Sequence, residues 1–149
     1  MAILEVLKFP DPRLRQKADK VTEITPELVR LAEDMLETMY HSRGIGLAAT
    51  QVGEKVRLVV LDTRLRENSR YDVESLSEME QQVPQPIQLF NPQIVKRSGE
   101  TVFSEGCLSV PGYYEEVTRS DYVEVTGLDK AGNVVLIKTD GLLAICLQH

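Results

Sequence analysis

The chain has 149 residues, with 17 lysines and arginines against 23 aspartates and glutamates, and a formal net charge of −6. Its 42% hydrophobic and 27% charged residues are ordinary for one globular domain, residues 1–149, and exclude disordered and fibrous proteins. Because no block of basic residues interrupts this acidic balance, we expect no direct binding of nucleic acid.

The sequence predicts a protein that stays out of membranes. Its longest wholly apolar run, residues 142–147, is far shorter than the roughly 20 residues that span a bilayer. The first residues lack the basic region of a secretory signal. Two cysteines, Cys107 and Cys146, are too few for a disulfide scaffold. We therefore expect a cytoplasmic protein with reduced thiols.

The clearest predicted helix covers residues 26–42. Thr25 is a typical N-cap, Pro26 suits the first helical position, and Glu27 favours the positive end of the helix dipole. Gly44 is the expected C-cap. Apolar side chains recur at steps of three and four residues and predict one stripe that faces a core: Leu28, Leu31, Met35 and Met39.

Residues 44–53 follow as a loop of small residues that leads into a strand over residues 56–61. The next stretch, residues 63–86, is polar and longer than the roughly 12–15 residues of an ordinary unstructured loop. We therefore expect a surface insertion there, with a short helix around residues 73–79.

The second half of the chain predicts mostly strands. Residues 87–95 and 100–103 have the composition of short strands. A β-hairpin is expected from residues 122–126 and 134–139, because turn residues separate two segments that alternate or are rich in branched side chains.

The last segment, residues 141–149, is apolar and predicts a buried helix capped by Thr139 or Asp140. It has no C-cap and no polar face, which indicates that this helix is truncated. Together the segments predict an α+β fold in which short, mostly antiparallel strands pack around helices.

Residues 44–51 form the first segment suited to chemistry. Their two glycines and two alanines let a backbone come close to a ligand. The simplest interpretation is a tight connection between helix and strand. The alternative is a backbone platform for an extended peptide, with the Gln51 side-chain amide as a hydrogen-bond donor.

Cys107 and the two histidines form the other candidates. A free cysteine is most often a small buried hydrophobe, but glycine and turn surroundings also suit a metal ligand or a nucleophile. His41 lies at the end of the first predicted helix, where a cation is normal. His149 therefore stays a candidate for a Cys/His site. Cys146, one helical turn before it, is more typical of a pocket or core residue.

Taken together, these segments resemble the peptide deformylase family. Residues 44–51 match its GxGxAAxQ signature, and Glu105-Gly-Cys-Leu-Ser109 matches its EGCLS signature. Residues 142–149 are similar to the start of its QHExxH signature. The Phe9-Pro-Asp-Pro-Arg-Leu14 opening and the Phe90-Asn-Pro92 segment also fit, and the resemblance covers nearly the whole chain outside residues 63–86.

The resemblance implies an enzyme that hydrolyses the N-formyl group of formyl-methionyl nascent peptides. In the family one cysteine and two histidines bind a divalent metal, commonly ferrous iron, that activates a water molecule. Cys107 and His149 occupy the positions of two of these ligands. Zinc, nickel and cobalt suit a thiolate–imidazole site nearly as well as Fe(II).

The other site residues are also carried over by motif position. Gln51 and the Leu108 backbone N–H are the implied donors to the oxyanion, and Glu105 is expected to order the cysteine loop by pairing with Arg119. Gly46 and Gly106 would bind the substrate peptide as an added strand. An apolar pocket for the methionine side chain is expected from four residues: Ile45, Leu142, Ile145 and Cys146.

The family pattern continues after His149 with a catalytic glutamate and a second histidine, which this sequence does not include. We expect a shortened form of a normal enzyme whose activity is impaired. The alternatives are a non-catalytic deformylase-like protein that binds formyl peptides, and a cysteine hydrolase with Cys107 as nucleophile. Association with the ribosome is a further partner that the resemblance allows.

Overall fold

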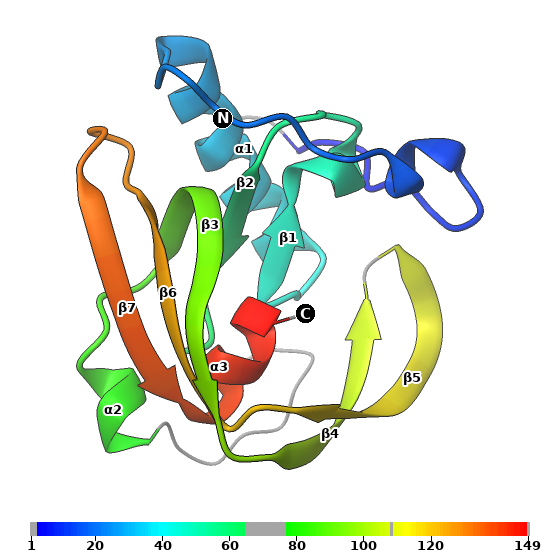
Figure 1. Ribbon diagram of the computed structural model, residues 1–149. Helices are drawn as coiled ribbons and strands as arrows, with labels where there is room; N and C mark the ends of the chain where they lie inside the picture. The colour runs from blue at the N-terminus through cyan, green and yellow to red at the C-terminus, as the bar shows by residue number, and fades with distance from the viewer. Residues whose placement is uncertain (1–2, 65–76, 108, 149) are drawn as a thin grey trace.

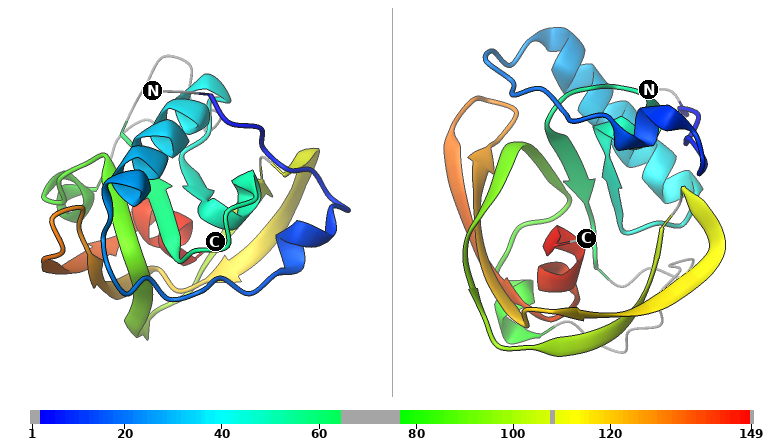
Figure 2. Two further views of the ribbon diagram at one scale, coloured as in Figure 1. Left: turned by 90° about the horizontal axis from the view of Figure 1, so that it is seen from above. Right: turned by 45° about the vertical axis from the view of Figure 1, so that its right-hand side comes forward.

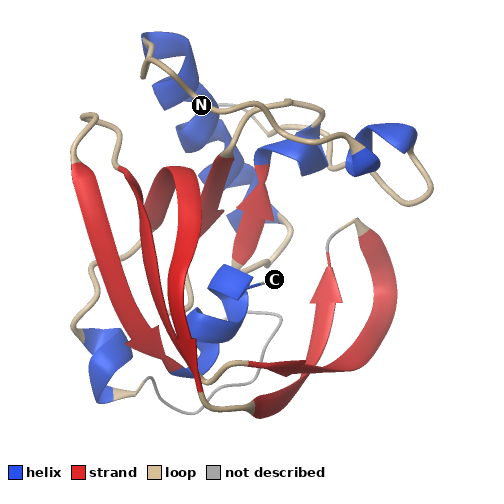
Figure 3. Cartoon of the chain, viewed as in Figure 1, coloured by secondary structure: helices blue, strands red, loops and turns tan. Residues whose placement is uncertain are grey.

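The computed structural model describes residues 3–64, 77–107 and 109–148 (Figure 1). Strands make up most of its ordered structure, with one long and two short α-helices (Figure 3), and the α+β class predicted from the sequence is confirmed. In chain order the elements are η1 (Pro12–Arg15), α1 (Pro26–His41), β1 (Gly46–Ala48), η2 (Ala49–Val52), β2 (Leu58–Leu61), α2 (Glu78–Gln81), β3 (Ile87–Ser98), β4 (Thr101–Cys107), β5 (Val110–Arg119), β6 (Tyr122–Leu128), β7 (Val134–Asp140) and α3 (Gly141–Gln148).

The strands form two antiparallel sheets. One has five strands in the order β1-β2-β3-β6-β7, and the other pairs β4 with β5. Helix α3 lies between the two sheets, while α1 packs at the β1 and β2 end of the larger sheet (Figures 1 and 2). The predicted hairpin is β6–β7, and β1 is an edge strand of the larger sheet.

Helix α1 follows the prediction closely at its start. The Thr25 side chain accepts a hydrogen bond from the Leu28 N–H at 3.2 Å. At the other end the prediction of Gly44 as the C-cap is wrong, because Ser42 is the C-cap and Arg43 takes the left-handed conformation with φ +58°. The Gly44 N–H instead reaches back to the Met39 carbonyl at 2.9 Å, which closes a Schellman-type end.

Alternation along β2 creates two cores on opposite faces of the larger sheet. Leu58 and Val60 are buried with Met35 and Met39 of α1. Leu61, on the other face, is buried together with three groups of residues: Ile87 and Leu89 of β3, Val123, Val125 and Ile137 of the hairpin, and Leu143 and Ala144 of α3. Because successive side chains of a strand point to opposite faces, four residues serve both cores.

Two strands were not predicted from the sequence. The expected loop over residues 44–53 contains β1 and the 3₁₀ turn η2. Three residues are too few to show a strand pattern, and β1 exists through its antiparallel pairing with β2, Gly46 opposite Leu61. Strand β5 contains Pro111 and Gly112, which are breakers in local reasoning, and is held by its pairing with β4.

The described ends of the segment over residues 63–86 pack into the protein. Thr63 and Glu80 are buried, and the Thr63 N–H donates to Gln85 Oε1 at 2.8 Å. Helix α2 begins at Glu78, later than the helix expected at residues 73–79, of which 73–76 lie outside the described residues. That this segment is an insertion stays a prediction.

The N-cap predicted for α3 is also wrong. Thr139 and Asp140 were the expected N-caps, but the Leu143 N–H in the first turn donates to Glu80 Oε2 at 2.9 Å. The Asp140 carboxylate instead accepts a hydrogen bond from the Ser77 hydroxyl. The acceptor for this helix end therefore comes from α2, far away in the sequence.

Within residues 3–64, 77–107 and 109–148, no helix has both the length and the apolar character needed to cross a membrane.

Asn91 joins β3 to the segment before α1. Its Oδ1 accepts from the Val21 N–H and its Nδ2 donates to the Val21 carbonyl, both at 2.8 Å. The residue has φ +51°, a conformation that asparagine tolerates better than most residues. Asn91 therefore contributes to the fold both through its side-chain hydrogen bonds and through its backbone conformation.

We expect Asn91→Ala to lower the free energy of unfolding by about 2–3 kcal/mol, because it removes two hydrogen bonds and places alanine at a positive φ. Asn91→Gly should cost less, since glycine accepts this φ without strain. Urea denaturation of the wild type and both variants measures the difference. Equal stability of all three chains would contradict the role of Asn91.

Candidate active site

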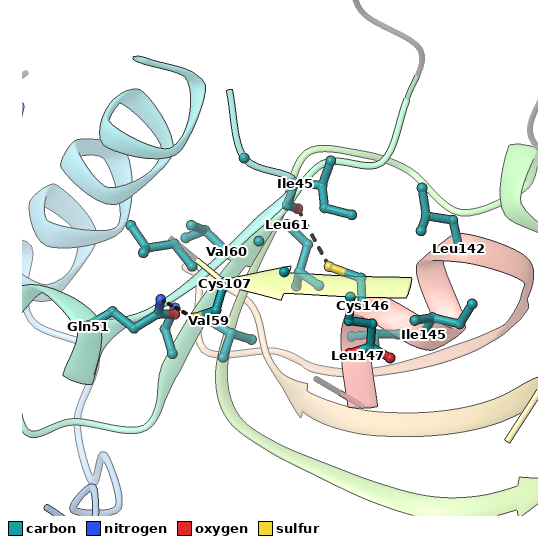
Figure 4. A pocket seen from close by; sticks show the side chains of 16 residues that line it. Ile45, Gln51, Val59, Val60, Leu61, Cys107, Leu142, Ile145, Cys146 and Leu147 are labelled. Carbon is teal, nitrogen blue, oxygen red and sulfur yellow. Dashed lines mark hydrogen bonds between the residues drawn. The ribbon is translucent and has the colours of Figure 1, made fainter. Parts of the chain in front are cut away.

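A cavity of about 140 Å³ lies between the edge strand β1, strand β2, the end of β4 and helix α3 (Figure 4). Its wall is mainly apolar. It brings together nine of the residues singled out from the sequence: Ile45, Gly46, Gln51, Glu105, Gly106, Cys107, Leu142, Ile145 and Cys146. Two further predicted site residues, Leu108 and His149, lie outside the described residues. His41 is exposed at the end of α1 and is not among the lining residues.

Gly46 sits where β1 meets α3. A Cβ atom at this position would lie 2.8 Å from the Cys146 sulfur, closer than real Cβ contacts come. Glycine therefore allows the helix to approach the strand. Because β1 pairs only with β2 in the sheet order, its other edge is directed toward the cavity side of the molecule.

Gln51 is held in one orientation on η2. Its Oε1 accepts a hydrogen bond from the Ala48 N–H at 2.9 Å, which leaves the Nε2 group as the donor on the other side. That nitrogen lies 3.4 Å from Cys107 Sγ and 3.3 Å from Ser109 Oγ. An amide donor is thus fixed beside the cysteine sulfur (Figure 4).

The N-terminal segment ties these two groups together. The Leu7 N–H donates to the Gln51 carbonyl at 2.7 Å, and the Phe9 N–H donates to the Ser109 carbonyl at 2.8 Å. One stretch of extended chain therefore contacts both η2 and the turn after β4. It links the backbone of Gln51 to that of Ser109, two residues after Cys107.

Glu105 and Arg119 form the ion pair expected from the sequence. The Arg119 Nε donates to Glu105 Oε2 at 2.9 Å and its NH2 group donates to Oε1 at 3.1 Å. The carboxylate is only 4% exposed, and its hydrogen bonds raise the pKa of Arg119. A two-point pair of this kind links β4 to β5, two residues before Cys107.

Helix α3 supplies the apolar side of the cavity. Leu142, Ile145 and Cys146 line it, and the Cys146 thiol donates to the Ile45 carbonyl at 3.6 Å. Burial, with a smaller contribution from the charge of Glu105, raises the pKa of the Cys146 thiol to about 12. This sulfur therefore stays protonated at neutral pH, which favours a role as part of the wall over a role as a ligand.

Several lining residues were missed by sequence reasoning. They share no motif and line the cavity through the pairing of β1 with β2 and through the end of α3: Leu47, Val59, Val60, Leu61 and Leu147. The strand over residues 56–61 was expected, but which of its residues border the cavity depends on a pairing that the sequence pattern does not reveal.

The residues described here hold one of the two predicted metal ligands. Cys107 ends β4 on the cavity wall, and a cysteine sulfur in this place suits a divalent metal of borderline softness. Across the described ranges, no three His, Cys, Asp or Glu side chains gather closely enough to hold a metal ion. The described residues alone therefore do not supply all the ligands that a metal ion needs.

Comparison with known proteins gives a consistent result. The pattern of the polypeptide deformylase family matches residues 3–149. The chain is 44% identical over its whole length to the peptide deformylase of Alkalilimnicola ehrlichii, of which it covers 75%. It is 46% identical to the enzyme of Neisseria gonorrhoeae and covers 80% of that protein.

Solved structures agree with the sequence comparison. A peptide deformylase from Legionella pneumophila superposes with a TM-score of 0.84 at 42% identity, over 99% of this chain and 78% of that one. The enzyme of Ehrlichia chaffeensis in complex with actinonin superposes with a TM-score of 0.85 at 35% identity, over 100% of this chain and 81% of that one. The chain therefore belongs to the polypeptide deformylase family, whose members are hydrolases that act in protein biosynthesis.

Proposed function

We propose that this hydrolase removes the formyl group from formyl-methionyl nascent peptides in the cytoplasm, with the 140 Å³ cavity as its methionine pocket. The proposal rests on one observation: polar groups and an apolar surface lie next to each other in the same cavity wall. The Gln51 amide lies 3.4 Å from the Cys107 sulfur, and the apolar face of α3 continues the same cavity wall. Such a cavity would accommodate a polar reacting group and an apolar side chain side by side.

The peptide is proposed to bind as an added strand. Gly46 lies in the edge strand β1, and Gly106 lies near the end of β4, so that two backbones border the cavity. Backbone hydrogen bonds of this kind do not depend on the side chains of the bound peptide. The enzyme would therefore accept many sequences after the first residue.

Selectivity for methionine is assigned to the apolar wall. Burying a methionine side chain contributes about 1.5–3 kcal/mol relative to leaving it in water. At about 1.4 kcal/mol for each factor of ten, this corresponds to a preference of roughly 10- to 100-fold over a peptide that begins with formyl-alanine. Ile45, Leu142, Ile145 and Cys146 are the residues proposed to supply it.

The polar end of the cavity is assigned to the formyl group. A divalent metal, ferrous iron as the first choice and zinc, nickel or cobalt as the others, would be held by Cys107 and His149 and would supply an activated water molecule. The Gln51 Nε2 group and the Leu108 backbone N–H would donate hydrogen bonds to the oxygen that gains negative charge. Donors fixed before the reaction cost no reorganisation during it.

Formate release under anaerobic conditions tests the function. The family pattern places a glutamate and a second histidine after His149, so the assay compares the 149-residue chain with the same chain followed by the family's Glu-x-x-His sequence. We expect the extended chain to release formate from formyl-Met-Ala-Ser only when a divalent metal such as ferrous iron is present. Peptide binding without any release would indicate a non-catalytic binding protein, and release that resists chelators would indicate a cysteine hydrolase.

Replacing Gln51 by alanine tests the donor. We expect turnover by the active chain to fall about 10²–10³-fold with little change in KM, because the donor acts on charge that develops in the transition state. Gln93→Ala, an exposed position on β3, is the matched control and should leave the rate unchanged. Full activity of Gln51→Ala would remove this residue from the mechanism.

Replacing each of the two cysteines in turn tests the assignment of the metal ligand, with one variant as the control for the other. Cys107→Ala should abolish tight metal binding, while Cys146→Ala should retain it, because the Cys146 thiol stays protonated. The metal content of the purified variants, and the thiolate-to-cobalt absorption after cobalt substitution, measure this. Full occupancy in Cys107→Ala would overturn the ligand assignment.

A further inference from the structure

We propose that Glu80, which lies outside the cavity, is a positioning residue that fixes the first turn of α3 and thereby the width of the methionine pocket. The inference rests on the pocket assignment made under the proposed function. It concerns a residue within the polar segment 63–86, outside the three sequence motifs that carry the family resemblance.

Glu80 is a buried carboxylate with backbone partners. It is 2% exposed, its Oε2 accepts from the Leu143 N–H at 2.9 Å, and its Oε1 accepts from the Ser77 N–H at 3.0 Å. No lysine or arginine of the described ranges forms an ion pair with it. Buried carboxylate oxygens need hydrogen-bond donors, and the first turn of a helix offers them through its free N–H groups.

Helix α3 needs such an acceptor. Leu142 and Leu143 in its first turn are buried, so water does not reach their surroundings easily. The neighbouring Thr139 hydroxyl donates to the Asp140 carbonyl, and the Asp140 carboxylate accepts from Ser77. The function of an N-cap is therefore carried by a side chain 63 residues earlier in the sequence.

Gly141 leaves room for this arrangement. It has φ +66°, and a Cβ atom on it would collide with the Glu80 carboxylate. Two separate requirements, a left-handed backbone and an open space, thus meet at the first residue of α3. Glycine meets both requirements, because it accepts a positive φ and leaves space for the Glu80 carboxylate beside the helix start.

The opposite end of α3 is fixed independently. The Gln148 side chain accepts from the Ser120 N–H at 2.9 Å and donates to the Ser120 carbonyl at 2.6 Å. Loss of Glu80 would therefore release the first turn, which carries Leu142 of the pocket wall, and leave the last turn in place. We expect an effect on recognition of the methionine side chain that exceeds the effect on the polar end of the cavity.

The test uses Glu80→Ala and Glu80→Gln, with Glu78→Ala on the exposed side of α2 as the matched control. Calorimetry gives the Kd of the 149-residue chain for formyl-Met-Ala-Ser and formyl-Ala-Ala-Ser. Hydrogen exchange followed by NMR gives the protection of the Leu143 amide. We expect Glu80→Ala to reduce the methionine preference about tenfold and to expose the Leu143 amide.

Glu80→Gln should recover part of the preference, because its amide oxygen still accepts from Leu143, and Glu78→Ala should match the wild type. Wild-type preference and wild-type protection of Leu143 in Glu80→Ala would overturn the inference. So would an equal loss of affinity for both peptides, which reports a smaller folded fraction and no change of the pocket. A wild-type chain that binds both peptides equally would instead reject the pocket assignment, and the inference with it.

Discussion

Every part of the site depends on burying one short, apolar helix between two sheets. Helix α3 has eight residues, of which four are buried, and an isolated helix of this length is unstable in water. Its stability therefore comes from contacts with residues far away in the sequence. Leu143 and Ala144 pack on the larger sheet, while Ile145 and Cys146 border the cavity. The same packing that stabilises the helix also shapes the cavity proposed to bind the methionine side chain.

Local patterns predicted the elements that carry their own signal. The stripe and the N-cap of α1 lie within one segment, and so do the turn and the alternation of β6–β7, so both were predicted near their observed bounds. Strand β1 and strand β5 exist through pairing with β2 and β4, and their own residues do not reveal it. The end of α1 was misplaced because Arg43 adopts the backbone conformation expected of a glycine.

In the candidate site, too, residues within short motifs were predicted, and residues placed by long-range contacts were not. Gln51 and Cys107 were found because short motifs carry them, and the structure brings the two side chains into contact. Their roles in binding and catalysis stay predictions. Glu80 was not found, because an acidic residue in a polar segment gives no sign that it will be buried against a helix 63 residues later. The β2 residues that line the cavity were missed for a similar reason, since their place beside it depends on strand pairing.

The protonation state of Cys146 has a consequence for the redox chemistry of the cavity. Cys107 and Cys146 both line it, and thiol–disulfide exchange requires one sulfur to attack as a thiolate. A pKa of about 12 keeps the Cys146 sulfur from attacking at neutral pH. Its hydrogen bond to the Ile45 carbonyl also directs the thiol proton toward β1. Oxidation of Cys107 to a sulfenic acid would therefore meet a protonated thiol at Cys146, which disfavours an internal disulfide between the two cysteines.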